Sequence, residues 1–108
     1  MPIKIFRTSL VSGLYLIMTS GAAYAADAQI LYTQSLAATC ANCHGTQGKS
    51  LKDASVPGLA GRPSAYLIEQ MQAFKAGTRE ATIMHQIAKG YTDEQVKQMA
   101  DYFASQKP

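Results

Sequence analysis

Cysteine is scarce in this chain of 108 residues, since the only two stand at positions 40 and 43. Neither therefore has another cysteine elsewhere in the sequence as a disulfide partner. No stretch alternates apolar and polar residues with a period of two, so β-strands are not expected. Internal repeats, low-complexity tracts and dense clusters of lysine or arginine are lacking too. The absence of such clusters argues against nucleic-acid binding.

The first residues have the composition of an export signal. Residues 1–7 carry two basic side chains and no acidic one, and the apolar run from Thr8 to Ala26 is uncharged. Ala23-Tyr24-Ala25 matches the small-x-small site at which signal peptidases cut. We therefore predict a signal peptide at residues 1–25 and one domain at residues 26–108. An uncleaved anchor is the alternative, because the uncharged run is just long enough to span a bilayer.

Charge and location follow from this division. Lys4 and Arg7, two of the ten basic residues, would leave with the signal peptide, and the rest nearly balance the seven acidic residues. The basic isoelectric point of the whole chain therefore gives no case for a nucleic-acid partner. We expect a periplasmic protein of bacterial type, with no stable membrane insertion after cleavage.

Periodicity and end signals predict an all-α domain of about four helices. Apolar residues recur at i, i+3, i+4 and i+7 from Leu67 to Phe74, and Pro63 and Gly77 bound this helix. Thr92 opens the last helix with a capping-box pattern. The other two helices are expected at residues 27–39 and 85–89.

Two further features concern how these helices are joined and packed. Residues 45–61 are rich in glycine and polar side chains, and a bare loop of this length is usually functional. The side of the first helix from Ile30 to Leu36 is expected to pack against the apolar stripe of the last helix, which runs from Val96 to Phe103.

Cys40-Ala-Asn-Cys43-His44 has the spacing at which c-type haem is attached. Each thiol can add to one vinyl group of the porphyrin, and His44 then falls beneath the ring, where its imidazole can bind the iron. A thioredoxin-like pair would need a βαβ pattern, and a zinc site would have only His85 as a further ligand. We therefore predict one covalent haem c, with Cys40 and Cys43 as its attachment residues and His44 as an iron ligand.

Met84 is the predicted second ligand of the iron. Met71 and Met99 lie on apolar helical stripes, where core packing explains them. Met84 lies outside both stripes, and its thioether sulfur suits iron and favours the reduced state. The neighbouring His85 is the alternative.

Further residues are predicted to complete the haem site. The ring nitrogen of His44 that does not bind iron needs a hydrogen-bond acceptor, and the carbonyl of Pro57 is the candidate. A simple turn proline is the alternative. Exclusion of water from the haem pocket would raise the reduction potential of the iron. The side chains predicted to seal the pocket are Leu59, Tyr66, Leu67, Met71, Phe74 and Ile83.

Taken together, these positions resemble the class I cytochromes c, and the pattern is similar to one half of the dihaem cytochrome c4. The stretch from Ile83 to Glu94 also resembles the cytochrome subunit of flavocytochrome c sulfide dehydrogenase. This chain departs from the dihaem relatives in having one attachment site. The matching segments are Cys40-Ala-Asn-Cys-His44-Gly, Pro57-Gly-Leu-Ala-Gly61, Tyr66-Leu, Phe74-Lys-Ala-Gly-Thr-Arg79, Met84 and Ala100-Asp-Tyr-Phe-Ala104.

Iron bound by both His44 and Met84 has no open position for a substrate, which predicts a one-electron carrier rather than an enzyme. The resemblance implies that a sulfide-oxidising flavoprotein subunit supplies the electrons and that a downstream acceptor receives them. Two alternatives remain open. One is a free-standing periplasmic cytochrome that shuttles electrons between respiratory or photosynthetic complexes. The other is a haem sensor or enzyme with an open distal site.

Overall fold

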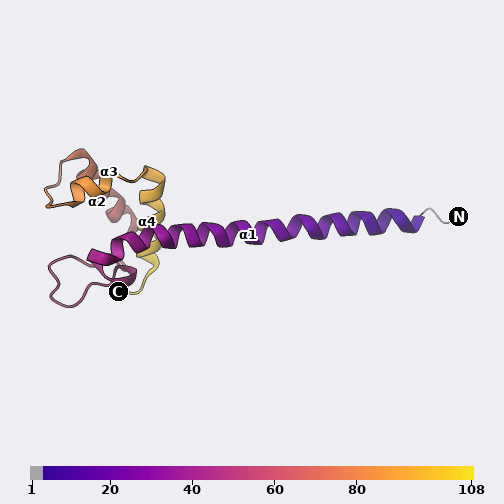
Figure 1. Cartoon of the computed structure of the whole chain (residues 1–108), viewed down its shortest axis with the longest axis horizontal. Coiled ribbons are helices and arrows are strands. Elements are labelled where there is room, and N and C mark those ends of the chain that lie inside the picture. Colours follow the sequence, from indigo (N-terminus) through magenta and orange to yellow (C-terminus); the bar gives the residue numbers. More distant parts are fainter. Residues whose placement is uncertain (1–3) are drawn as a thin grey trace. The chain divides into compact units, whose positions relative to one another are not determined.

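The computed structural model describes the backbone of residues 4–108 and the side chains of residues 24–108 (Figure 1). This part of the chain forms four α-helices and one short 3₁₀ helix and contains no strand, which confirms the predicted all-α class. The chain divides into two units, residues 1–32 and residues 33–108, and the core lies in the second. The helices are α1 (Lys4–His44), η1 (Thr46–Gly48), α2 (Ser64–Ala76), α3 (Met84–Lys89) and α4 (Asp93–Ser105).

Helix α1 begins earlier than expected. Residues 1–3 of the predicted signal peptide, and its side chains up to residue 23, lie outside the described part of the chain. The helix continues through Asp27, where a new helix was expected to start, because the surrounding sequence is rich in alanine and free of proline. Within the residues that the structure describes, none of the helices has the length and apolar character needed to cross a membrane. The signal-peptide boundary stays a prediction.

The same helix also ends later than expected, at His44 rather than near Thr39. The cysteine motif therefore forms the last turn of α1 and not a loop after it, since nothing in Ala41-Asn42 breaks a helix. Gly45 ends the helix with φ of 86°. A side chain at Gly45 would bring its Cβ within 2.1 Å of the carbonyl oxygen of Lys49, so the turn requires glycine here.

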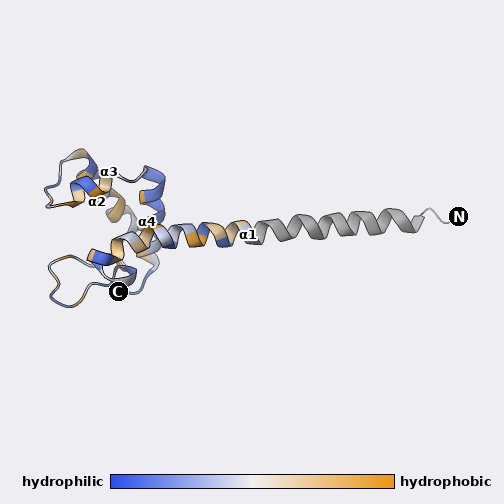
Figure 2. Ribbon diagram, viewed as in Figure 1, coloured by the Kyte–Doolittle hydropathy of each residue, from blue (hydrophilic) through white to orange (hydrophobic). Residues whose placement is uncertain are grey.

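The core of the second unit joins three helices. Val96, Met99, Ala100 and Phe103 form the predicted stripe of α4, and they pack with Leu67 of α2 and Ala37 of α1. On the predicted face of α1, Leu36 packs against this core. Ile30 and Leu31 belong to the first unit and are 55% and 64% exposed. Alanine at the contact suits close packing of two helices. The mixture of hydrophobic and hydrophilic residues over residues 24–44 of α1 can be followed in Figure 2.

The ends of α2 and α4 follow the local signals. Pro63 precedes the first residue of α2, and Gly77 closes the helix with φ of 75°. At α4, the amide of Gln95 donates to the Thr92 hydroxyl over 3.2 Å, and the amide of Thr92 donates to the Gln95 side chain over 2.9 Å. This is the predicted capping box.

The segment between α1 and α2 is closed against the core. The carbonyl of Gly48 accepts hydrogen bonds from the amides of Leu59 (2.8 Å) and Ala60 (3.1 Å), which brings the two ends of the loop together. The amide of Gly61 donates to the carbonyl of Phe103 over 2.9 Å. The long loop is therefore anchored to α4 at its end, and this anchoring fixes the position of Pro57 within it.

Candidate functional site

His44 is buried at the end of α1, with 9% of its surface exposed. Its Nδ1 lies 2.7 Å from the carbonyl oxygen of Pro57, the acceptor suggested by the sequence. A carbonyl can only accept, so Nδ1 carries the hydrogen of this bond, and in the neutral imidazole the lone pair is then on Nε2. A neutral imidazole oriented in this way has the form that metal-binding histidines take.

Cys40 and Cys43 lie three residues apart on the last turn of α1, and both are free thiols. Cys40 is half-buried and Cys43 is exposed. Burial raises the pKa of the Cys40 thiol, while the Thr39 hydroxyl acts in the opposite direction. Because i, i+3 and i+4 positions share a helix face, Cys40 lies on the same side of α1 as Cys43 and His44.

A hydrogen bond beside the cysteine motif was not foreseen from the sequence. The Thr39 hydroxyl donates to the carbonyl of Leu36 over 2.7 Å, so its oxygen is left to accept from the Tyr91 hydroxyl, also 2.7 Å away. Tyr91 lies between α3 and α4 and is partly buried against the core. This hydrogen bond connects the helix that carries Cys40 to a segment distant in the sequence. No local sequence pattern predicts it.

Met84 is the first residue of α3 and is half-buried. The other methionines considered occupy core positions, since Met99 is 4% exposed and Met71 packs against the core cluster. His85 follows Met84 on α3 and is also half-buried. The geometry thus places Met84 outside the packed core, while its role as an iron ligand stays a prediction.

The residues predicted to seal the pocket differ in exposure. Leu67 and Phe74 are each 9% exposed, and Leu59 packs against the core. Tyr66 and Ile83 are 43% and 58% exposed. The structure therefore buries two of these side chains on α2 and leaves two at the surface, and their contact with a haem stays a prediction.

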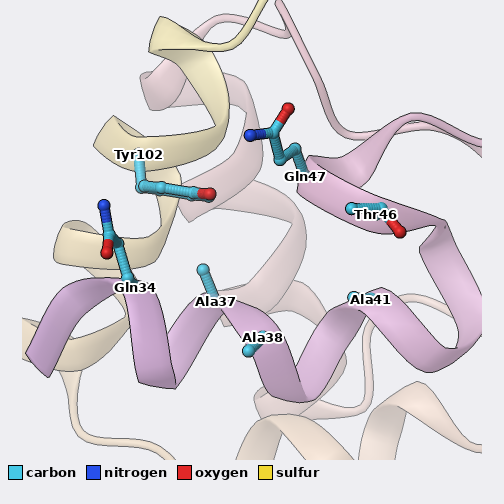
Figure 3. A pocket seen from close by; sticks show the side chains of 7 residues that line it. All are labelled: Gln34, Ala37, Ala38, Ala41, Thr46, Gln47 and Tyr102. Carbon is cyan, nitrogen blue, oxygen red and sulfur yellow. The ribbon is translucent and has the colours of Figure 1, made fainter. Parts of the chain in front are cut away.

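A cavity of about 140 Å³ lies elsewhere, between α1, η1 and α4 (Figure 3). Small α1 side chains form part of its lining, and Tyr102 of α4 contributes its ring. None of the predicted haem-site residues lines it. The residues that do are Gln34, Ala37, Ala38, Ala41, Thr46, Gln47 and Tyr102.

The side chains at the end of α1 fit a covalently attached haem. Two unpaired thiols are present at the required spacing, and the buried imidazole of His44 is oriented by the contact between its Nδ1 and the Pro57 carbonyl. Among the described residues, no group of three or more His, Cys, Asp or Glu side chains could hold a bare metal ion.

Comparison with known proteins agrees with this chemistry. The family model described as cytochrome c matches residues 25–107. The cytochrome subunit of sulfide dehydrogenase from Chlorobaculum tepidum is 39% identical over 70 residues, and the match covers 65% of this chain and 62% of the relative. The thiosulfate dehydrogenase electron acceptor of Stutzerimonas stutzeri is 35% identical over 94 residues, which are 83% of this chain and 44% of the relative. This chain therefore spans less than two thirds of either relative.

A solved structure supports the fold. The cytochrome c4 of Acidithiobacillus ferrooxidans is 42% identical with a TM-score of 0.57, and the match covers 61% of this chain and 37% of that chain. The resemblances to cytochrome c4 and to the sulfide dehydrogenase subunit are thereby confirmed. The chain belongs to the cytochrome c family: it has the class I cytochrome c fold, and its cofactor is covalently bound haem c with its iron.

Proposed function

We propose that the haem is attached through Cys40 and Cys43, and that its iron is bound by His44 on one side and by Met84 on the other. The haem iron supplies the one-electron redox change. The observation that carries this proposal is the hydrogen bond from His44 Nδ1 to the Pro57 carbonyl, because it leaves Nε2 free to bind a metal.

His44 and Pro57 act together in this proposal. The hydrogen bond to the carbonyl holds the imidazole in one tautomer and one orientation, and it makes the other nitrogen a better electron donor. Because the acceptor is a backbone atom in an anchored loop, it keeps its place in both oxidation states. Little rearrangement then accompanies the gain or loss of an electron.

As a second ligand, Met84 would leave the iron no open position for a substrate or gas. A thioether stabilises the reduced state relative to a second nitrogen ligand, which raises the potential. Exclusion of water raises it further, because a low-dielectric pocket disfavours the more charged oxidised state. We assign this sealing role to the residues predicted above, which are Leu59, Tyr66, Leu67, Met71, Phe74 and Ile83.

The spectrum of the purified protein tests the ligation. A weak band at the red end of the oxidised spectrum, from sulfur-to-iron charge transfer, is expected if Met84 binds the iron. Carbon monoxide should fail to bind the reduced protein at low concentration. Ready binding of carbon monoxide together with absence of the red band would favour the haem sensor or enzyme with an open distal site.

For the partner, we propose a flavoprotein subunit that oxidises sulfide and passes electrons to this cytochrome, which passes them to a downstream acceptor. This proposal rests on the similarity to the cytochrome subunit of sulfide dehydrogenase. A free-standing periplasmic carrier is the second candidate. The similarity to a thiosulfate dehydrogenase electron acceptor, which covers more of this chain, favours it.

Purification of the native protein from its own cells distinguishes the two candidates. A bound flavoprotein and reduction of the haem by added sulfide support the first. A cytochrome that purifies alone and is not reduced by sulfide in the same extract supports the second.

The periplasmic location is also part of the proposal, and the family match beginning at residue 25 is consistent with it. The mass of the mature protein should correspond to a chain that starts at Ala26 and carries one haem. A mass that includes residues 1–25 would contradict signal cleavage and favour the uncleaved anchor.

A further inference from the structure

The chain folds back over α2 immediately after that helix ends. We call residues 77–83, which join α2 to α3, the connector. The amides of Thr78 and Arg79 both donate to the carbonyl of Ala73, over 3.0 and 3.3 Å, and the Thr78 hydroxyl donates to the same carbonyl over 3.3 Å. The start of the connector is thus held against the last turn of α2.

The side chain of Arg79 continues this return. Its guanidinium carbon lies 4.6 Å from the centroid of the Phe74 ring, and one of its N–H groups donates to the side-chain oxygen of Gln70. Gln70 and Phe74 are four residues apart and share one face of α2. The guanidinium is therefore bound to the helix rather than extended into water, although Arg79 is exposed.

The rest of the connector has less to hold it. Glu80 and Thr82 are exposed. Segments with few buried apolar contacts open locally at low free energy. Met84 follows at once as the first residue of α3. The position of its thioether therefore depends on how firmly the connector is held where it leaves α2.

We propose that Arg79 is a positioning residue: by binding Phe74 and Gln70 it fixes the connector and so keeps Met84 on the haem iron. The inference rests on the proposed ligation by Met84. Arginine suits this role better than lysine, because its flat guanidinium can lie over an aromatic ring while an N–H group reaches an amide oxygen. Arg79 touches neither the haem nor the iron in this scheme and acts only through Met84.

The test is an imidazole titration of the oxidised holoprotein. Exogenous imidazole binds where Met84 leaves the iron, so its apparent affinity reports how often the thioether is displaced. Arg79→Gln should contain the normal amount of haem and bind imidazole about three- to tenfold more tightly than the wild type. The red charge-transfer band should weaken at lower imidazole concentrations in this variant.

Three further variants separate the contributions of charge and hydrogen bonding and provide a control. Arg79→Lys keeps the positive charge but loses the flat guanidinium group, and its imidazole affinity should lie between those of the wild type and Arg79→Gln. Gln70→Leu removes only the hydrogen-bond acceptor and should shift the affinity in the same direction by a smaller factor. Lys107→Gln removes one positive charge from the exposed C-terminal tail and should bind imidazole as the wild type does.

The outcomes separate this inference from the ligation on which it rests. If the wild type lacks the red band, the ligation by Met84 fails and the inference fails with it. If the wild type has the band and Arg79→Gln binds imidazole with unchanged affinity, only the inference fails. A lowered melting temperature with unchanged imidazole affinity would likewise overturn it, since that is the result of a merely structural role. Should Arg79→Gln fail to mature, Arg79→Lys and Gln70→Leu decide by the same criterion.

Discussion

His44 and Pro57 are joined by a hydrogen bond of 2.7 Å between the ring Nδ1 and the backbone carbonyl oxygen. The bond links the end of α1 to a loop that is itself anchored to α4 through Gly61 and Phe103. The orientation of the imidazole is therefore determined by the tertiary fold as well as by the attachment motif. Changes at the ligands should accordingly alter the spectrum and the reduction potential, whereas changes in the surrounding fold should alter stability.

Replacement of Met84 by alanine should leave the covalent haem in place but open one side of the iron. We expect carbon monoxide and imidazole to bind, and the potential to fall by roughly a hundred millivolts or more, within the range of about 0.8 V that axial ligands span. Ligand titrations and redox potentiometry measure these effects. Met99→Leu is the matched control, because Met99 is buried in the core and a volume-conserving change should leave the spectrum intact. An unchanged spectrum in Met84→Ala would refute the axial assignment.

Replacement of residues in the attachment motif should impair haem attachment and folding. Cys40→Ala and His44→Ala are expected to yield severalfold less haem-containing protein and poorly folded chains, because a domain this small has a limited core without its cofactor. Haem content per protein, measured from the Soret absorbance, gives the result. His85→Ala should mature normally, since His85 is not a proposed ligand. Full haem content in His44→Ala would count against His44 as the proximal residue.

The hydrogen bond between Thr39 and Tyr91 should contribute to stability without affecting the iron. Tyr91→Phe is expected to lower the free energy of unfolding by about 0.5–1.5 kcal/mol, the usual worth of one hydrogen bond. Denaturant unfolding of the holoprotein measures it, and the potential should stay the same. In the double variant Thr39→Val/Tyr91→Phe, the two losses should not add, because both remove one interaction. Strict additivity would show that the two hydroxyls do not interact.

Acid should weaken the contact between α2 and α4. Lys97 and then Ser64 donate hydrogen bonds to Asp101, and both lower the pKa of its carboxyl group. A lowered pKa means that this stabilisation is complete above the unfolded-state value of about 4 and is lost as the pH falls through the lower folded-state value.

Thermal unfolding of Asp101→Asn as a function of pH tests this linkage. The variant should melt a few degrees below the wild type at neutral pH, and the difference should vanish in strong acid. The effect is small because the carboxylate is exposed and water screens the ion pair. Asp93→Asn, which removes the ion pair between Lys75 and Asp93, is the control for loss of a surface charge. A gap that persists undiminished in acid would contradict the role of the Asp101 carboxylate.

The features that could be foreseen depend on residues close together in the chain. The haem motif requires only that two thiols and an imidazole stand at a fixed spacing, so five consecutive residues predict the cofactor. The end of α2 at Gly77 and the capping box of Thr92 are likewise formed within a few residues. Local patterns were less reliable for α1, where alanine-rich sequence carries the helix past Asp27 and the absence of a breaker carries it through the motif to His44.

The helical class and the covalent haem could be inferred before the fold was known, because they follow from periodicity and from the spacing of adjacent reactive side chains. The family could be inferred from the resemblance of its motifs. The folded chain was needed to show that Ala37 of α1 is packed in the core, that Tyr91 contacts Thr39 across 52 residues, and that Arg79 lies on Phe74. Such contacts depend on how whole helices pack against one another. The identity of a single residue does not indicate which distant residue it will contact.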